Sequence, residues 1–270
     1  MRIHVAEHGA GPAVLALHGQ PGSGDGFSSL VPALVPGHRL LLADRPGYGL
    51  TGGSAIGMTQ NADRFASVLR EAGAAPAVVI GHSYGGGVAV LLAARHPEVV
   101  SGLVLVGSIG DSSSVTLSDR VAALPVVGDA LVAGALYGFG RLLPPLRELA
   151  RPLGGRFGRW IQTTLPDEEY AEAAGRSATS VWKAFRDEQR FLVSEIDEVE
   201  AAIAEVEQPT AVITGAWDAV VSPRVAAGMA RRLANARLMV LEGVGHFVPR
   251  DAPGAIAEAV AWVEERFAEG

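Results

Sequence analysis

Short apolar runs recur along the chain, and most are followed by a segment in which apolar side chains repeat with helical spacing. Six runs end at a loop, at residues 13–17, 39–43, 77–80, 103–106, 211–214 and 237–241. They are apolar throughout and do not alternate with polar residues, which is typical of parallel strands buried on both faces. We therefore predict six strands of a mostly parallel sheet.

Helical patterns lie between these runs and after the last of them. They cover residues 59–72, 83–95, 223–233 and 253–267. The alternation of strands and helices predicts the α/β class with a doubly wound, mostly parallel sheet. Such sheets bind ligands at the carboxyl ends of their strands, so we expect a functional site in the loops at that edge.

One long segment, residues 110–208, lacks strand-like runs of the same quality. Its patterns are helical, at 117–124, 127–137, 167–177, 179–188 and 191–205. A segment of this length is too long for a loop in a compact domain. We predict that residues 1–109 and 209–270 form the core and that 110–208 form a helical cap, inserted after the strand that ends at Val106.

An apolar stretch within this segment, 124–136, is too short to span a bilayer and is interrupted by Gly128, Asp129 and Gly134. A buried cap helix is favoured over a lipid-facing or dimerising surface. Homodimerisation stays open.

The composition excludes several classes of function. The net charge is −7 and the sequence pI is about 5.5, which argues against nucleic-acid binding because that usually needs a basic face. The chain has no cysteine, which excludes disulfides, thiol catalysis and Cys-ligated metals. The first residues show no apolar signal-peptide core, so a cytoplasmic location is the default expectation.

The most informative motif is Gly81-His82-Ser83-Tyr84-Gly85, a G-x-S-x-G pattern between an apolar run and a helical segment. A sharp turn from strand to helix exposes the serine hydroxyl, and glycines on both sides avoid a collision of strand and helix. A serine nucleophile also needs a histidine, a carboxylate and oxyanion donors.

Candidates for these partners follow other predicted strands. Asp218 follows the run 211–214, and His246 lies in a Gly-rich loop after 237–241. Asp218 as a simple turn cap is one alternative, and Asp111, just beyond Val106, is a rival carboxylate. Ser, Asp and His occur in the chain order of one known architecture, which makes a chance arrangement a poor explanation.

A third loop, His18-Gly19-Gln20-Pro21-Gly22, follows the strand at 13–17. A glycine-rich turn at this position can direct a backbone N–H at a developing oxyanion, and the N–H groups of Gln20 and Tyr84 are the candidate donors. We expect His18 to brace this loop and His82 to pack below the site. The histidines show no metal-ligand spacing, so neither a metal nor a cofactor is expected.

These motifs, together with Asp44-Arg45-Pro46-Gly47-Tyr48-Gly49, make the chain resemble α/β-hydrolase-fold proteins over essentially its full length. The resemblance implies a Ser83–His246–Asp218 triad, an oxyanion hole at Gln20 and Tyr84, a cap domain, and a first edge strand that is missing or very short. Haloalkane dehalogenases and many epoxide hydrolases are similar around residues 18–22 but use an Asp nucleophile. Ser83 therefore argues against an alkyl-enzyme mechanism.

The expected reaction is acyl transfer to water from a small, largely apolar ester. C–C bond hydrolysis, amidase or aminopeptidase activity, cofactor-free perhydrolysis and a non-catalytic ligand receptor remain alternatives. The cap is expected to set specificity. Its apolar side chains offer a pocket wall, although most of them are expected to form the core of the cap and not to contact substrate: Leu124, Val127, Leu131, Leu136, Tyr137, Phe139, Leu142, Leu143, Trp160, Trp182 and Phe185. One arginine from 141–159 is a candidate partner for a substrate carboxylate, although a solvated helix face is the favoured interpretation.

Overall fold

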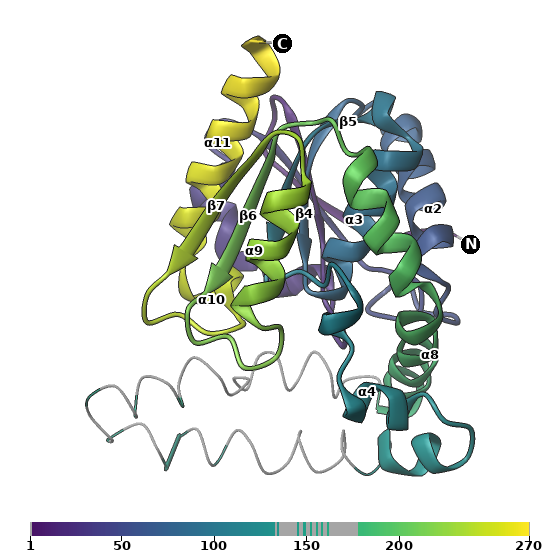
Figure 1. Cartoon of the computed structure of the whole chain (residues 1–270). Coiled ribbons are helices and arrows are strands. Elements are labelled where there is room, and N and C mark those ends of the chain that lie inside the picture. Colours follow the sequence, from purple (N-terminus) through teal and green to yellow (C-terminus); the bar gives the residue numbers. More distant parts are fainter. Residues whose placement is uncertain are drawn as a thin grey trace.

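The computed structural model describes residues 2–132 and 178–269, with isolated positions at 134, 145, 148, 149, 152, 155, 158 and 161. A seven-stranded sheet in the order β1-β3-β2-β4-β5-β6-β7 forms its centre (Figure 1). The strands are β1 Val5–His8, β2 Ala13–Leu17, β3 Arg39–Ala43, β4 Ala77–His82, β5 Val100–Val106, β6 Thr210–Gly215 and β7 Ala236–Leu241. All neighbours run parallel except β1, which pairs antiparallel with β3.

The six predicted strands are confirmed, and the α/β class with them. The seventh strand, β1, was implied to be missing or very short, and it is four residues long. Its sequence, Val-Ala-Glu-His, gives a weak apolar signal because an edge strand is only partly buried.

Strand β7 departs from the expectation of burial on both faces. Its burial alternates along the strand, and Leu238 and Val240 are 39% and 48% exposed. The reason is its position at the edge of the sheet, where no further strand or helix covers it fully.

Helices cover both faces of the sheet. Side chains of α2 Met58–Glu71, α3 Tyr84–Arg95 and α9 Pro223–Arg232 pack on one face. Those of η1 Gly24–Leu30, α1 Val31–Leu34, α10 Val248–Asp251 and α11 Pro253–Glu269 pack on the other. Successive residues of β4 alternate between the two layers, with Val79 in the first and Ile80 in the second.

The segment expected to be helical contributes α4 Leu117–Ala122 and α8 Ala178–Ala202, with short helices η3 Ser112–Ser114 and η4 Ile203–Glu205. Another short helix, η2 Pro97–Val99, precedes β5. Residues 127–132 are also helical, whereas the helix predicted at 167–177 lies outside the described residues. Within 2–132 and 178–269, no helix has the length and apolar character needed to cross a bilayer.

The helical patterns at 179–188 and 191–205 are confirmed as helix, and they belong to one continuous helix, α8, of 25 residues, which η4 follows. The residues between the two patterns, Gln189 and Arg190, are good helix formers, and no Gly or Pro interrupts the helix. Its second half enters the core, where Leu192, Ile196 and Val199 are buried against the layer containing α3.

Candidate active site

Ser83 occupies a sharp turn between β4 and α3. Its φ of 55° and ψ of −121° place a non-glycine residue in a sparsely populated region of backbone space. The turn is held by hydrogen bonds from Ser83 N–H to Val106 O, at 3.0 Å, and from Gly86 N–H to Ser83 O, at 2.9 Å. The strained backbone thus directs Ser83 into a pocket at the carboxyl edge of the sheet.

The glycines of the elbow allow close backbone packing. A Cβ atom added to Gly85 would lie 2.2 Å from Leu17 O and 2.6 Å from His18 O, and one added to Gly81 would lie 2.6 Å from Gly85 O. Only glycine lets the start of α3 approach the end of β2 so closely.

We expect Gly85→Ala to lower the free energy of unfolding by about 1–3 kcal/mol, because backbone atoms must move apart to admit the methyl group. Urea denaturation measures the change. Gly26→Ala is the control, since a Cβ atom there meets nothing within 4 Å. Equal losses in the two variants would contradict the steric argument.

His246 and Asp218 are brought together by the loops after β7 and β6. His246 Nδ1 lies 2.8 Å from Asp218 Oδ2, and both side chains are buried. The other carboxylate oxygen, Oδ1, accepts hydrogen bonds of 2.9 Å from the N–H groups of Val220 and Val221. The carboxylate is therefore fixed in one orientation, with one oxygen directed at the imidazole.

The rival carboxylate lies elsewhere. Asp111 Oδ1 accepts a hydrogen bond of 2.9 Å from Ser113 N–H and caps the short helix η3. The structure thus brings Asp218 to His246 and leaves Asp111 in a capping role.

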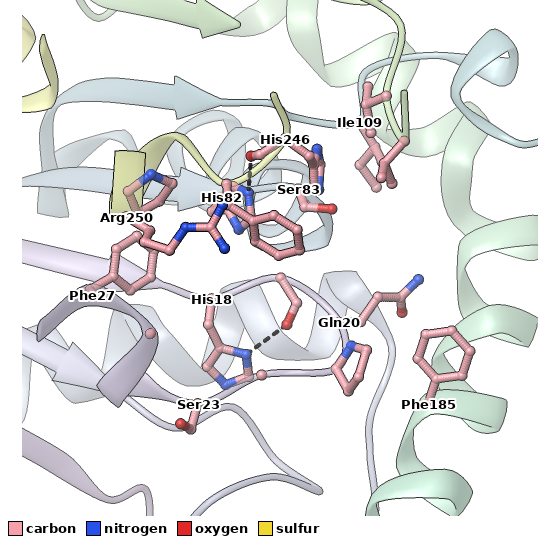
Figure 2. Close-up of a pocket in the computed structure, with 18 of the residues that line it drawn as sticks. His18, Gln20, Ser23, Phe27, His82, Ser83, Ile109, Phe185, His246 and Arg250 are labelled. Carbon is pink, nitrogen blue, oxygen red and sulfur yellow. Dashed lines mark hydrogen bonds between the residues drawn. The ribbon is translucent and has the colours of Figure 1, made fainter. Parts of the chain in front are cut away.

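Ser83 and His246 line the same pocket, together with Gln20. Figure 2 shows the Ser83 side chain beside the His246 ring at the pocket wall. Tyr84 is the first residue of α3, where a helix has no internal acceptor for its N–H. Neither this N–H nor that of Gln20 donates a hydrogen bond to another described residue, so both backbone donors are available to a ligand.

His82 has a contact that the sequence did not reveal. Its Nε2 donates a hydrogen bond of 3.0 Å to the backbone O of His246, and the two ring centroids are 4.7 Å apart (Figure 2). The motif position showed only that His82 lies within the elbow, whereas the contact joins residues 164 apart in the chain. His82 therefore supports the loop that carries His246.

Two histidines of the site resist protonation. Burial, with the nearby His246 as a second cause, lowers the pKa of His82 to about 3. Burial, with the charge of Arg45 as a second cause, holds the pKa of His18 well below its ordinary value. As the pH falls below about 6.5, the unfolded chain takes up protons at these imidazoles and the folded chain does not. The stabilisation that these two neutral imidazoles contribute is therefore fully present above this pH and is lost progressively as the pH falls toward 3.

We expect His82→Gln, which keeps a side-chain N–H donor but cannot titrate, to reduce this loss of stability. Between pH 7 and pH 4, the free energy of unfolding should fall by roughly 3 kcal/mol less in the variant than in the wild type. Urea denaturation at a series of pH values measures both slopes. Parallel slopes would show that His82 does not resist protonation in the folded protein.

The pocket has a volume of about 470 Å³. Its described wall is largely apolar, and one side is formed by Phe185, Gln189 and Leu192 on one face of α8. Other lining residues include Phe27, Ile109, Val220, Val221, Phe247 and Arg250. Within the described ranges, no three His, Asp or Glu side chains are grouped as metal ligands.

Of the described residues expected at the cap wall, Phe185 lines the pocket. Leu124, Val127 and Leu131 are about half exposed, because they lie on the outer surface and not at the pocket. Trp182 packs beside Arg186. The other expected wall residues, Leu136, Tyr137, Phe139, Leu142, Leu143 and Trp160, and the arginines of 141–159 lie outside the described residues.

The sheet order, the strained serine elbow and the His–Asp pair together define a class of α/β hydrolytic enzyme folds. Residues 12–253 match the family model for the alpha/beta hydrolase fold, so the chain belongs to this family. Members of the family include hydrolases of several kinds, and a hydrolytic activity is therefore supported.

Relatives of known name extend the comparison. The chain is 27% identical to a 2-hydroxymuconate semialdehyde hydrolase of Pseudomonas sp. strain CF600, over 96% of this chain and 89% of that protein. It is 27% identical to a pimeloyl-[acyl-carrier protein] methyl ester esterase of Neisseria meningitidis, over 95% and 77% of the two chains. Among solved structures, the haloalkane dehalogenase DbeA of Bradyrhizobium elkani superposes with a TM-score of 0.77 and 25% identity, over 99% and 96% of the chains.

Proposed function

We propose that this protein is a serine hydrolase that cleaves an ester-type bond through an acyl-enzyme intermediate. The observation that supports it most directly is the His246–Asp218 hydrogen bond beside the strained Ser83 elbow, in one pocket. Asp218 engages Nδ1 of the ring, which leaves Nε2 as the atom that can accept the serine proton.

The proposed reaction has two halves. Ser83 Oγ attacks the ester carbonyl carbon while His246 takes its proton, and the carbonyl π electrons move to the oxygen. The N–H groups of Gln20 and Tyr84 stabilise this oxyanion. The oxyanion then collapses, the bond to the alkoxy group breaks, and protonated His246 gives that group its proton. Water repeats the sequence at the acyl carbon and releases the acid.

The pocket favours a small substrate that is largely apolar. Its volume of about 470 Å³ and the apolar side chains from α8 and the loop after β6 fit an acyl chain of modest size. We infer that residues 110–208 act as a cap that selects this substrate, since α8 supplies Phe185 and Gln189 to the wall.

A fluorophosphonate probe and short-chain p-nitrophenyl esters test the proposal. The probe should label the wild type at Ser83, as located by peptide mass spectrometry, and the esters should be turned over. Ser23→Ala is the matched control for labelling, because Ser23 is another buried serine of the same pocket. Labelling that is absent or located elsewhere, or ester turnover that survives Ser83→Ala, would overturn the proposal. Ligand binding without turnover would favour a receptor.

A second candidate is hydrolysis of a carbon–carbon bond in a β-diketone-like substrate by the same three side chains. Similarity to the 2-hydroxymuconate semialdehyde hydrolase over nearly the whole chain is the observation that favours it. A panel of esters, amides, lactones and diketones distinguishes the two, since kcat/KM for a diketone above that for every ester would make this the better assignment.

A further inference from the structure

A fully buried arginine lies beneath the loop that carries Gln20. Arg45 follows β3, which lies beside β2 in the sheet with Leu17 and Ala43 in register. The loops that follow these two strands therefore leave the sheet at the same edge. The Arg45 side chain is 0% exposed, so its donors reach only protein groups.

Arg45 donates hydrogen bonds to two successive carbonyl groups of this loop. Its Nε lies 2.8 Å from His18 O, and its Nη2 lies 2.9 Å from Gly19 O. The Arg45 backbone N–H donates to His18 Nε2 at 2.9 Å. The ring proton must therefore be on Nδ1, which donates to Gly19 O at 2.7 Å (Figure 2). Two donors thus hold the Gly19 carbonyl.

This carbonyl determines where the next N–H points. The peptide bond between Gly19 and Gln20 is not among the cis bonds of the described chain, so it is trans. In a trans peptide, the C=O and the following N–H point in opposite directions. The N–H of Gln20 is therefore directed away from Arg45. Gly19 itself abuts the nucleophile, since a Cβ atom added to it would lie 2.9 Å from Ser83 Cβ.

The far side of the guanidinium is held by α8. Glu188 forms a two-point ion pair with Arg45 Nη1 and Nη2, and Tyr48 Oη donates to the same carboxylate at 2.7 Å. Burial disfavours the charged guanidinium, but the charge and hydrogen bond of Glu188, together with the nearby Tyr48 and Tyr84, outweigh this effect and raise the pKa of Arg45. On the same helix, Phe185 and Gln189 line the pocket. One buried ion pair thus joins the loop at residues 18–22 to α8, the helix that forms one side of the pocket.

Stability alone is a weak reason for this pair, because buried ion pairs are often matched or exceeded in stability by apolar residues of similar volume. We propose that Arg45 is a positioning residue that directs the N–H of Gln20 into the oxyanion hole, and that Glu188 makes this alignment depend on the seating of α8. The inference rests on the proposed serine hydrolase function.

The test replaces the pair with apolar side chains, so that no charge is left buried alone. The Arg45→Met/Glu188→Leu variant should fold, with a melting temperature lowered by only a few degrees, because no charge is left buried alone but His18 O and Tyr48 Oη lose hydrogen bonds. Its kcat for a p-nitrophenyl ester should fall about 10²-fold, as expected when one oxyanion donor is misaligned, with KM changed by less than about threefold. Arg39→Met is the control, since Arg39 begins β3, the strand that Arg45 follows, and pairs with Glu7 far from the pocket.

Two further measurements separate positioning from a structural role. Ser83 adds to a trifluoromethyl ketone, its proton passes to His246 and the carbonyl becomes an oxyanion, so the affinity of this inhibitor should fall by the same factor as kcat. Glu188→Gln, which keeps the shape but removes the charge, should speed amide hydrogen exchange in residues 18–23.

The outcomes distinguish this inference from the function on which it rests. Fluorophosphonate labelling of the wild type at Ser83, combined with a kcat in the folded double variant within about threefold of the wild type, would overturn the positioning role alone. Unchanged exchange in Glu188→Gln would overturn the dependence on α8. Absence of labelling at Ser83 in the wild type would overturn the proposed function and this inference with it.

Discussion

Replacement of Ser83 by alanine is expected to lower kcat for a p-nitrophenyl ester by about 10⁴–10⁶-fold, with little change in KM. The variant removes the attacking oxygen and keeps the strained elbow, because alanine meets the same backbone restriction as serine. The fold should be retained, since the bonds that hold the turn come from backbone atoms of Ser83 and Gly86. Steady-state kinetics and a thermal melt test both statements.

The effects of the three proposed catalytic side chains should not add. Because Ser83 and His246 act in one proton transfer, the Ser83→Ala/His246→Ala variant should be about as slow as Ser83→Ala alone. A further loss of several orders of magnitude in the double variant would show that His246 acts independently of Ser83.

Asp218→Asn is expected to lower kcat by about 10⁴-fold. The asparagine oxygen can still accept the hydrogen bonds from Val220 and Val221, so the loop should keep its shape. The amide NH₂ would then face His246 Nδ1 and donate to it, which moves the ring proton to Nε2. A ring in this tautomer cannot accept the proton of Ser83.

Asp111→Asn is the matched control for this variant. It removes the same charge from the other carboxylate considered for the role, which caps η3 instead. We expect kcat within about twofold of the wild type, since surface substitutions away from a site have small effects. A large loss in Asp111→Asn combined with a small one in Asp218→Asn would reverse the assignment.

The sequence predicted the sheet well because buried parallel strands leave a strong local signal. Each of β2 to β7 contains an uninterrupted apolar run, whereas β1 contains Glu7 and His8 and was not located. The two helical patterns of α8 were not joined by the sequence alone. The polar residues between them, Gln189 and Arg190, break the apolar pattern while the helix continues, and Gln189 lines the pocket.

The candidate site was predictable where each residue is tied to the end of a strand. Ser83, Asp218 and His246 follow β4, β6 and β7, and strand order brings those ends to one edge. Contacts made through tertiary packing alone were missed. Arg45 and Glu188 are 143 residues apart, and neither position carries a pattern that identifies its partner.

Because α8 is continuous, the two halves of one helix have different roles. Ile196 and Val199 anchor it in the core, Phe185 and Gln189 face the pocket, and Leu192 contacts both. Substitutions near Phe185 can therefore reshape the pocket without removing the anchor. Such a helix is a favourable place to diversify substrate choice, by natural variation or by directed evolution, on a scaffold that stays folded.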